Sequence, residues 1–142
     1  MASPRKAREY ALQMLYQWEL ARAEPARIES TFWKAARASE GTRLLANALF
    51  EGAAADCAAA DQMIARHAQH WRLERIAAID RSILRLAVHE LRRGDTPPKA
   101  VINEALELAR KFSDVGATGF INGVLDAIYQ SLRESPDEPS PP

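Results

Sequence analysis

The chain has 142 residues, with 19 Lys and Arg balanced by 19 Asp and Glu, and therefore no formal net charge. This length suffices to bury one sizeable core, whereas a neutral chain has no overall field to attract nucleic acid, so any such site must be a local patch. One cysteine, Cys57, excludes an internal disulfide. No apolar run approaches the ~20 residues of a membrane span, and no signal peptide opens the chain, so we expect a soluble cytoplasmic protein.

The N-terminal half has helical periodicity throughout. Ser3 and Pro4 suit the cap and the first position of a helix, and an apolar stripe continues this helix to Glu24-Pro25, where the next helix starts. An alanine-rich stretch from Thr42 to His70 predicts one long helix. Gly52 inside that stretch costs about 1 kcal/mol relative to alanine.

The C-terminal half is predicted to hold the centre of the fold. A short irregular link at Trp71–Ala78 leads to a helix from Asp80 to about Arg93, whose apolar arc is too wide for a surface helix. Val101–Ile128 has two apolar helical faces separated by a short break, so it predicts a helical hairpin. The proline-rich, acidic SPDEPSPP after Glu134 has no apolar residue to bury and predicts a disordered tail.

No stretch alternates apolar and polar residues with the period of a strand, so the predicted class is all-α, with about seven helices. Neither half has an obvious linker. We therefore expect one helical domain over residues 1–134, with N-terminal helices at about 3–70 packed on C-terminal helices at about 79–134, and a tail at 135–142.

The common enzyme motifs are absent: the sequence has no Gly-rich phosphate loop, no GxSxG and no HExxH. His67 and His70 could share a helix face, but Cys57 would lie about 15 Å up a straight helix from His67, too far for a third metal ligand. We expect His89 to be a hydrogen-bonded residue of the core, and Cys57 to be a small apolar filler. The sequence predicts no enzymatic activity, no cofactor and no metal site.

A local positive patch opens the chain. Arg5, Lys6 and Arg8 lie near the N-terminus of the first helix, where the helix dipole disfavours cations, which suggests that they serve an external anion. Tyr16 and, less closely, Gln13 follow on the same flank. Cations for phosphates and an aromatic ring for an unpaired base are features of single-stranded RNA surfaces. The alternative is a solvated helix start with a half-buried tyrosine.

Polar residues also interrupt the hairpin. Asn122-Gly123 lies inside an apolar helix, where each residue costs roughly 0.5–1 kcal/mol relative to alanine. Asn122 either satisfies a neighbouring helix end or faces outward to read a base edge, and Gly123 either permits close backbone approach or leaves room for a ligand. Arg110 and Lys111 suit the end of the preceding helix. We expect one or both of Asn103 and Glu104 to hydrogen-bond across to the adjacent helix.

Four segments carry a more specific pattern: RKAREYALQMLYQWEL at Arg5–Leu20, DRSILRLAVHEL at Asp80–Leu91, PPKAVINEALELARKF at Pro97–Phe112 and FINGVLDAI at Phe120–Ile128. In this order and spacing they resemble the NusB family of bacterial transcription antitermination factors. The resemblance implies two packed three-helix bundles. It also implies pairing with the small-subunit ribosomal protein NusE, binding of boxA RNA, and an effect on elongating RNA polymerase, notably in ribosomal RNA operons.

The resemblance further implies which residues form the sites. Those that match the family's RNA-facing surface are Arg5, Lys6, Arg8, Gln13 and Tyr16, together with Lys111, Phe112, Phe120, Asn122 and Gly123. The acidic Glu74 and Asp80 are the candidates for the side that faces NusE. We expect the double substitution Arg8→Ala and Lys111→Ala to reduce RNA binding without changing helicity or melting.

Two positions depart from the family pattern. Gly119 stands where relatives usually carry a lysine, and Val115-Gly116 stands where they often carry an acid. Loss of the lysine removes one phosphate contact, so RNA affinity and its salt dependence should be weaker by that contact. Because the chain is neutral, we expect weak RNA binding by the protein alone and tighter binding once NusE adds its basic surface.

Two other functions fit the same residues. A NusB-like module occurs at the N-terminus of ribosomal RNA cytosine methyltransferases; a catalytic domain should then follow, and the ending SPDEPSPP favours the free-standing factor. The second alternative is a purely protein-binding helical module, for example a homodimer that buries the RNA surface.

Overall fold

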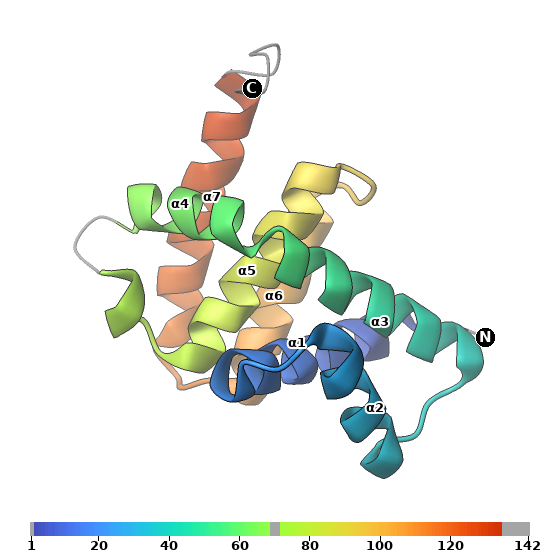
Figure 1. Ribbon diagram of the computed structural model, residues 1–142. Coiled ribbons are helices and arrows are strands. Elements are labelled where there is room, and N and C mark those ends of the chain that lie inside the picture. Colours follow the sequence, from blue (N-terminus) through green and yellow to red (C-terminus); the bar gives the residue numbers. More distant parts are fainter. Residues whose placement is uncertain (1, 69–71, 135–142) are drawn as a thin grey trace, which may run out of the picture.

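The computed structural model describes residues 2–68 and 72–134. Over these residues the chain forms seven α-helices, one 3-10 turn and no strand (Figure 1), which confirms the predicted all-α class. The helices are α1 Pro4–Ala21, α2 Pro25–Ala35, α3 Glu40–Ala55, α4 Cys57–His67, α5 Ala78–Arg93, α6 Pro98–Phe112 and α7 Ala117–Glu134, with the 3-10 turn η1 at Leu73–Arg75. His70, Trp71 and the predicted tail 135–142 lie outside the described residues.

The start of α1 follows the sequence prediction. The Ser3 side chain accepts a hydrogen bond from the backbone N–H of Lys6 at 3.3 Å, and Pro4 occupies the first helical position. The helix ends at Arg22, which adopts the left-handed conformation with φ 53°. Pro25 then opens α2, as expected from the Glu24-Pro25 pair.

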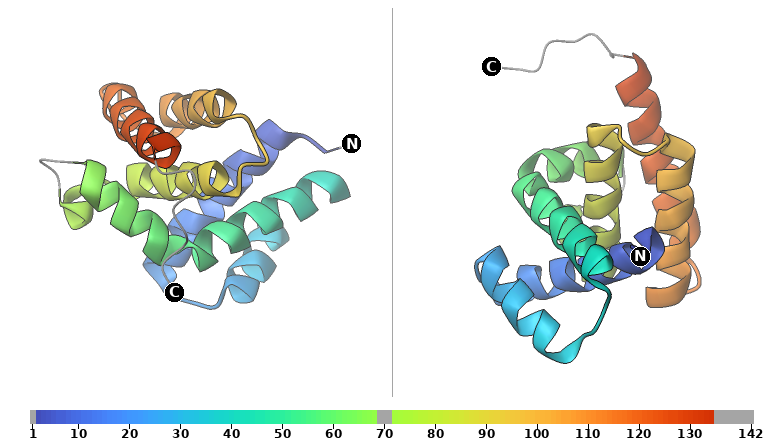
Figure 2. Two further views of the ribbon diagram at one scale, coloured as in Figure 1. Left: turned by 90° about the horizontal axis from the view of Figure 1, so that it is seen from above. Right: turned by 90° about the vertical axis from the view of Figure 1, so that its right-hand side faces the viewer.

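The single long helix predicted from Thr42 to His70 is wrong, because Asp56 divides it into α3 and α4. The chain changes direction at this point (Figure 2). The Asp56 carboxylate faces α5, where it contacts His89 Nδ1 at 3.4 Å and pairs with the Arg92 guanidinium. Alanines favour helix on both sides of the break, so local propensity did not reveal a bend that is set by contacts with α5.

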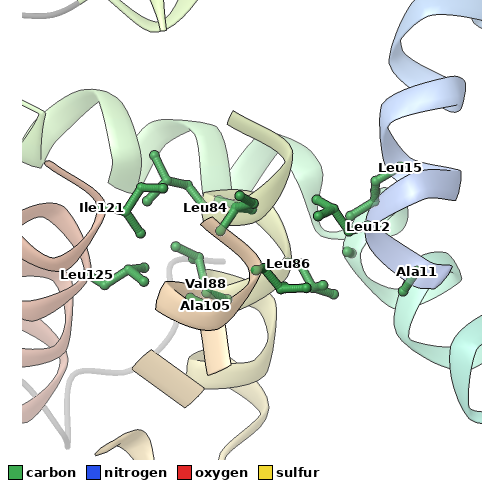
Figure 3. Packing of buried hydrophobic residues seen from close by; sticks show 14 of the residues in the cluster. Ala11, Leu12, Leu15, Leu84, Leu86, Val88, Ala105, Ile121 and Leu125 are labelled. Carbon is green, nitrogen blue, oxygen red and sulfur yellow. The ribbon is translucent and has the colours of Figure 1, made fainter. Parts of the chain in front are cut away.

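Helix α5 is the central element, as predicted. Every residue from Ser82 to Leu91 is buried, and α5 contacts α1, α3, α4, α6 and α7. Figure 3 shows Leu86 pointing towards Leu12 of α1, whereas Val88 points towards Leu125 of α7. The described helices therefore form two packed three-helix bundles, α1–α3 and α5–α7, with α4 beside α5 and α7.

Gly52 has a packing role that the sequence did not reveal. A Cβ at this position would collide with the imidazole of His89, which is only 6% exposed. The glycine therefore lets α3 approach α5 at the place where His89 is buried. The expectation that His89 belongs to the core is confirmed.

Partly buried ion pairs join α5 to α1 of the first bundle and to α4. Arg85 Nε donates to Asp61 of α4 at 2.7 Å, and Arg85 Nη1 donates to Glu19 of α1 at 3.1 Å. Arg81 also pairs with Glu19, and its Nη1 donates to the carbonyl oxygens of Leu73 at 3.0 Å and Ile76 at 2.6 Å. This network fixes the segment around η1 against α1 and α5.

Candidate nucleic-acid interface

Two ion pairs join the start of α1 to α6. Arg5 Nε lies 3.2 Å from a Glu104 carboxylate oxygen, and Lys111 Nζ lies 2.7 Å from Glu9. The two helices pass each other here, about 100 residues apart in sequence (Figure 2, right). The expected cross-helix bond of Glu104 is confirmed. The fold thus brings the cationic opening of the chain together with the end of the first hairpin helix.

A groove of about 290 Å³ lies between α1 and α6. It is lined by Arg5, Arg8, Glu9, Glu104, Glu107, Leu108, Arg110 and Lys111. The four cations among these residues face three carboxylates, so the groove carries mixed charge rather than the simple positive patch that the sequence suggested. Glu107 and Arg110 pair with each other at 2.5 Å.

The cations of two ion pairs in this groove are exposed. The side chains of Arg5 and Lys111 are 63% and 54% exposed, and Lys6 contacts Glu9 only at 4.0 Å. Water and salt screen the exposed cation of each pair, so such pairs contribute about 0–1 kcal/mol to stability, although the partners Glu104 and Glu9 are only 21% and 13% exposed. If a phosphate took the place of the carboxylate beside one of these cations, the protein would therefore lose little stability.

Arg8 behaves differently from its neighbours. Its Nε and Nη2 donate to the two oxygens of Glu90 on α5 at 2.9 and 2.8 Å, and the two side chains are only 11% and 8% exposed. The hydrogen bond to Glu90 raises the pKa of Arg8. This geometry argues against unchanged melting of Arg8→Ala, since the substitution would leave Glu90 buried without its partner.

Tyr16 and Gln13 follow on the same side of α1. Tyr16 is 36% exposed, which leaves part of its ring accessible. Gln13 is half-buried, and its Nε2 donates to the backbone carbonyl of Glu9 at 3.2 Å. The structure thus leaves Tyr16 available for stacking, while Gln13 is partly engaged within its own helix.

The hairpin residues lie at the end of α6 and on α7. Phe112 is half-buried, with Lys111 Nζ 5.7 Å from the centre of its ring, and Phe120 is also half-buried. Asn122 and Gly123 are exposed, and a Cβ at Gly123 would meet nothing within 4 Å. Of the roles expected for these two residues, the outward-facing Asn122 and the glycine that leaves room fit the geometry.

The two candidates for the partner-facing side lie at and just before the N-terminal end of α5. Glu74 is exposed in η1, and Asp80 is half-buried in the first turn of α5. Asp80 accepts a hydrogen bond from Ser113 Oγ at 2.5 Å, in the connection between α6 and α7. This bond ties the proposed partner side to the hairpin.

Within the described residues no group of three or more His, Cys, Asp and Glu side chains could hold a metal ion. Cys57 is half-buried and its Sγ lies 3.7 Å from Asp61. Burial raises the pKa of its thiol to about 11, although the nearby Arg85 opposes the rise. Within the part of the chain that the structure describes, no helix is both long and apolar enough to cross a membrane.

The fold and the groove define a small all-helical protein of two three-helix bundles, with ion pairs of exposed cations where the start of α1 meets α6. The sequence profile of the NusB family matches residues 5–130. A transcription antitermination protein NusB of Solibacter usitatus is 44% identical over the whole chain, which covers 97% of that relative. The chain belongs to the NusB family.

Solved structures agree with this assignment. The solution structure of NusB from Aquifex aeolicus is 30% identical, with a TM-score of 0.82, over 98% of this chain and 96% of that one. A crystal structure of the antitermination factors NusB and NusE in complex with double-stranded RNA has a matching chain that is 28% identical, with a TM-score of 0.78. That match covers 89% of this chain and 96% of the solved chain.

Proposed function

We propose that the protein is a transcription antitermination factor that binds boxA-type single-stranded RNA together with NusE. In this role it acts on elongating RNA polymerase, notably in ribosomal RNA operons. The observation that carries the proposal is the meeting of α1 and α6 through the Arg5–Glu104 and Lys111–Glu9 pairs, in a chain of the NusB family. The Solibacter usitatus relative is named a transcription antitermination protein, and a similar solved chain is a NusB bound with NusE and RNA.

The proposed mechanism starts with electrostatic capture. Arg5, Lys6 and Lys111 exchange their exposed carboxylate partners for RNA phosphates, which releases counterions from the strand. Tyr16 and Phe120 then contact unpaired bases, and Asn122 reads a base edge. Phe112, Gln13 and Gly123 complete the surface that the family resemblance assigns. Arg8 acts indirectly, because its pair with Glu90 holds the start of α1 on α5.

Stacking of this kind favours a single strand, since bases within a duplex have no free face. The similar solved complex contains double-stranded RNA, so the test must include both forms. Because three carboxylates of the groove offset most of the charge of its four cations, RNA binding by the protein alone should be weak. NusE, bound on the side of Glu74 and Asp80, would extend the basic surface.

The protein is in this view a non-catalytic adaptor of the cytoplasm, where transcription takes place. Residues 1–134 act as one domain, because α5 packs against helices of both bundles. The Glu19–Arg81–Arg85–Asp61 network adds polar contacts to that packing. No part of the proposed role requires a cofactor.

The decisive experiment measures fluorescence anisotropy of labelled boxA RNA, as a single strand and as a duplex, with and without purified NusE. We expect the single strand to bind more tightly than the duplex, and NusE to increase its affinity at least tenfold. Light scattering of the same samples reports the size of the complex. Absence of binding to either RNA form in the presence of NusE, or a homodimer that persists with RNA and NusE, would contradict the proposal.

A further inference from the structure

A second hollow lies where η1, the start of α5 and the start of α7 meet, and no role has been assigned to it. Its volume is about 340 Å³. Ile76, Ala77, Ala117 and Phe120 supply apolar wall, and Arg75, Asp80, Asp114 and Gly116 complete the lining. Phe120 belongs to the proposed RNA surface and Asp80 to the proposed partner side, so the hollow joins the two.

The walls of the hollow are held in place by hydrogen bonds. Arg81 donates to the carbonyl oxygen of Ile76 at 2.6 Å, which fixes the η1 side. On the opposite side, Ser113 donates to Asp80, and the backbone N–H of Ala117 donates to the Asp114 carbonyl at 3.0 Å. The hollow is therefore formed before any ligand arrives, which lowers the entropic cost of binding.

The polar groups at its edge select the chemistry of a ligand. Asp114 is exposed, and among the described residues nothing donates a hydrogen bond to its carboxylate. Asp80 has one oxygen bonded to Ser113. Two carboxylates beside apolar walls repel a phosphate but accept N–H donors from a flat, largely apolar ring. Arg75 is an exposed cation on the same rim, where a phosphate could lie.

We propose that this hollow binds one unpaired nucleobase of the RNA strand, with a preference for guanine. The base packs against Phe120 and the exposed Ala77, and the N1–H and N2–H groups of its Watson–Crick edge donate to the Asp114 carboxylate. Arg75 holds the flanking phosphate. Guanine is favoured because it presents two adjacent N–H donors to one carboxylate, whereas uracil presents a single N–H. This inference rests on the proposed function, and assigns a base preference within it.

The test uses single-stranded oligouridylates of about 12 nucleotides, each carrying one guanine at a different position, with fluorescence anisotropy in the presence of NusE. For the parent protein we expect one position at which guanine increases affinity about tenfold over uridine. Inosine at that position, which lacks the N2 amine, should lose most of the gain. Equal affinity for all guanine positions overturns the inference while leaving RNA binding intact.

Two variants locate the preference in the hollow. Asp114→Asn keeps the shape of the side chain but replaces an acceptor oxygen with an N–H₂ donor, so the ratio of guanine to uridine affinity should fall to about one. Gly116→Leu should lower the same ratio by filling the hollow, because a Cβ at Gly116 meets nothing within 4 Å and the backbone there is unstrained. Val115→Leu, one residue earlier and fully exposed, is the matched control and should keep the preference.

The remaining outcomes separate this inference from its foundation. If the parent binds no RNA with or without NusE, the proposed function and this inference both fail. If RNA binds and Asp114→Asn keeps the guanine preference, only this inference fails. If Gly116→Leu weakens NusE binding in the absence of RNA but leaves the preference unchanged, a side chain of the protein partner occupies the hollow and the inference is wrong. Melting curves confirm that each variant is folded.

Discussion

The groove between α1 and α6 and the network around α5 contain the same chemistry, arginine or lysine facing a carboxylate, but differ in burial. In the groove, Arg5 and Lys111 are more than half exposed. Around α5, the side chains of Arg8 and Arg85 are 11% and 10% exposed. An exposed pair can exchange its carboxylate for a phosphate, whereas a buried pair cannot open without leaving a charge in the interior. Burial thus divides the cations into those whose carboxylate partner can be exchanged for another anion and those that hold the fold.

The largest expected effect is on Arg85. Its guanidinium faces both Asp61 and Glu19, so Arg85→Ala leaves the partly buried Asp61 without a cationic partner and leaves Glu19 with Arg81 alone. The free energy of unfolding should fall by about 3–5 kcal/mol, as measured by urea denaturation. Arg66→Ala, on the exposed side of α4, is the control and should change it by less than about 0.5 kcal/mol. Equal losses of unfolding free energy from the two substitutions would show that burial does not separate the cations that hold the fold from the exposed ones.

Arg5 and Arg8 give the sharpest comparison, since they lie three residues apart on one helix. Arg8→Ala should reduce the free energy of unfolding by about 2–3 kcal/mol, because it leaves Glu90 alone. Arg5→Ala should change it by less than about 0.5 kcal/mol. Urea denaturation of both variants measures the difference. A similar loss of stability from both would show that the exposed pair is not exchangeable.

Lys111→Ala tests the other side of the comparison, the RNA affinity. Loss of one phosphate contact should reduce the slope of log affinity against log salt concentration by about 0.7, with stability unchanged within about 0.5 kcal/mol. Anisotropy titrations of boxA RNA over a range of salt concentrations measure the slope. Arg66→Ala removes the same charge elsewhere and should leave the slope as in the parent. An unchanged slope for Lys111→Ala would remove this residue from the proposed site.

The sequence predicted the elements well and the pairing of side chains poorly. Helical periodicity revealed the central role of α5 and the hairpin of α6 and α7, and the order and spacing of four segments indicated the NusB family. Periodicity could not reveal that Arg8 lies against Glu90 or Lys111 against Glu9, because each pair joins residues more than 80 positions apart. For the same reason the sequence could not show why position 52 is a glycine, since this depends on the position of His89 on another helix.

The smallest predicted effect concerns a pair that contains no cation. Glu29 of α2 faces Glu51 of α3, and burial, followed by hydrogen bonding to Glu51 and the charge of Glu51, raises the pKa of Glu29 to about 7, while Arg43 opposes the rise. Since the folded state binds this proton more tightly than the unfolded chain, where the pKa is 4.5, the contribution to stability is complete below pH 4.5 and is lost as pH rises through about 7.

Glu29→Gln should therefore act in a pH-dependent way. The amide can donate to Glu51 as the protonated acid does, but it does not ionise. Relative to the parent, the variant should gain about 1 kcal/mol of unfolding free energy between pH 5 and pH 8, a figure reduced for the partial exposure of the site. Urea denaturation of both proteins at the two pH values measures the gain. If the variant and the parent differed in unfolding free energy by the same amount at pH 5 and pH 8, a proton held by Glu29 in the folded state would be excluded. Unlike the exchangeable pairs of the groove, this contact has no cation to offer RNA, so boxA affinity should stay constant in the variant.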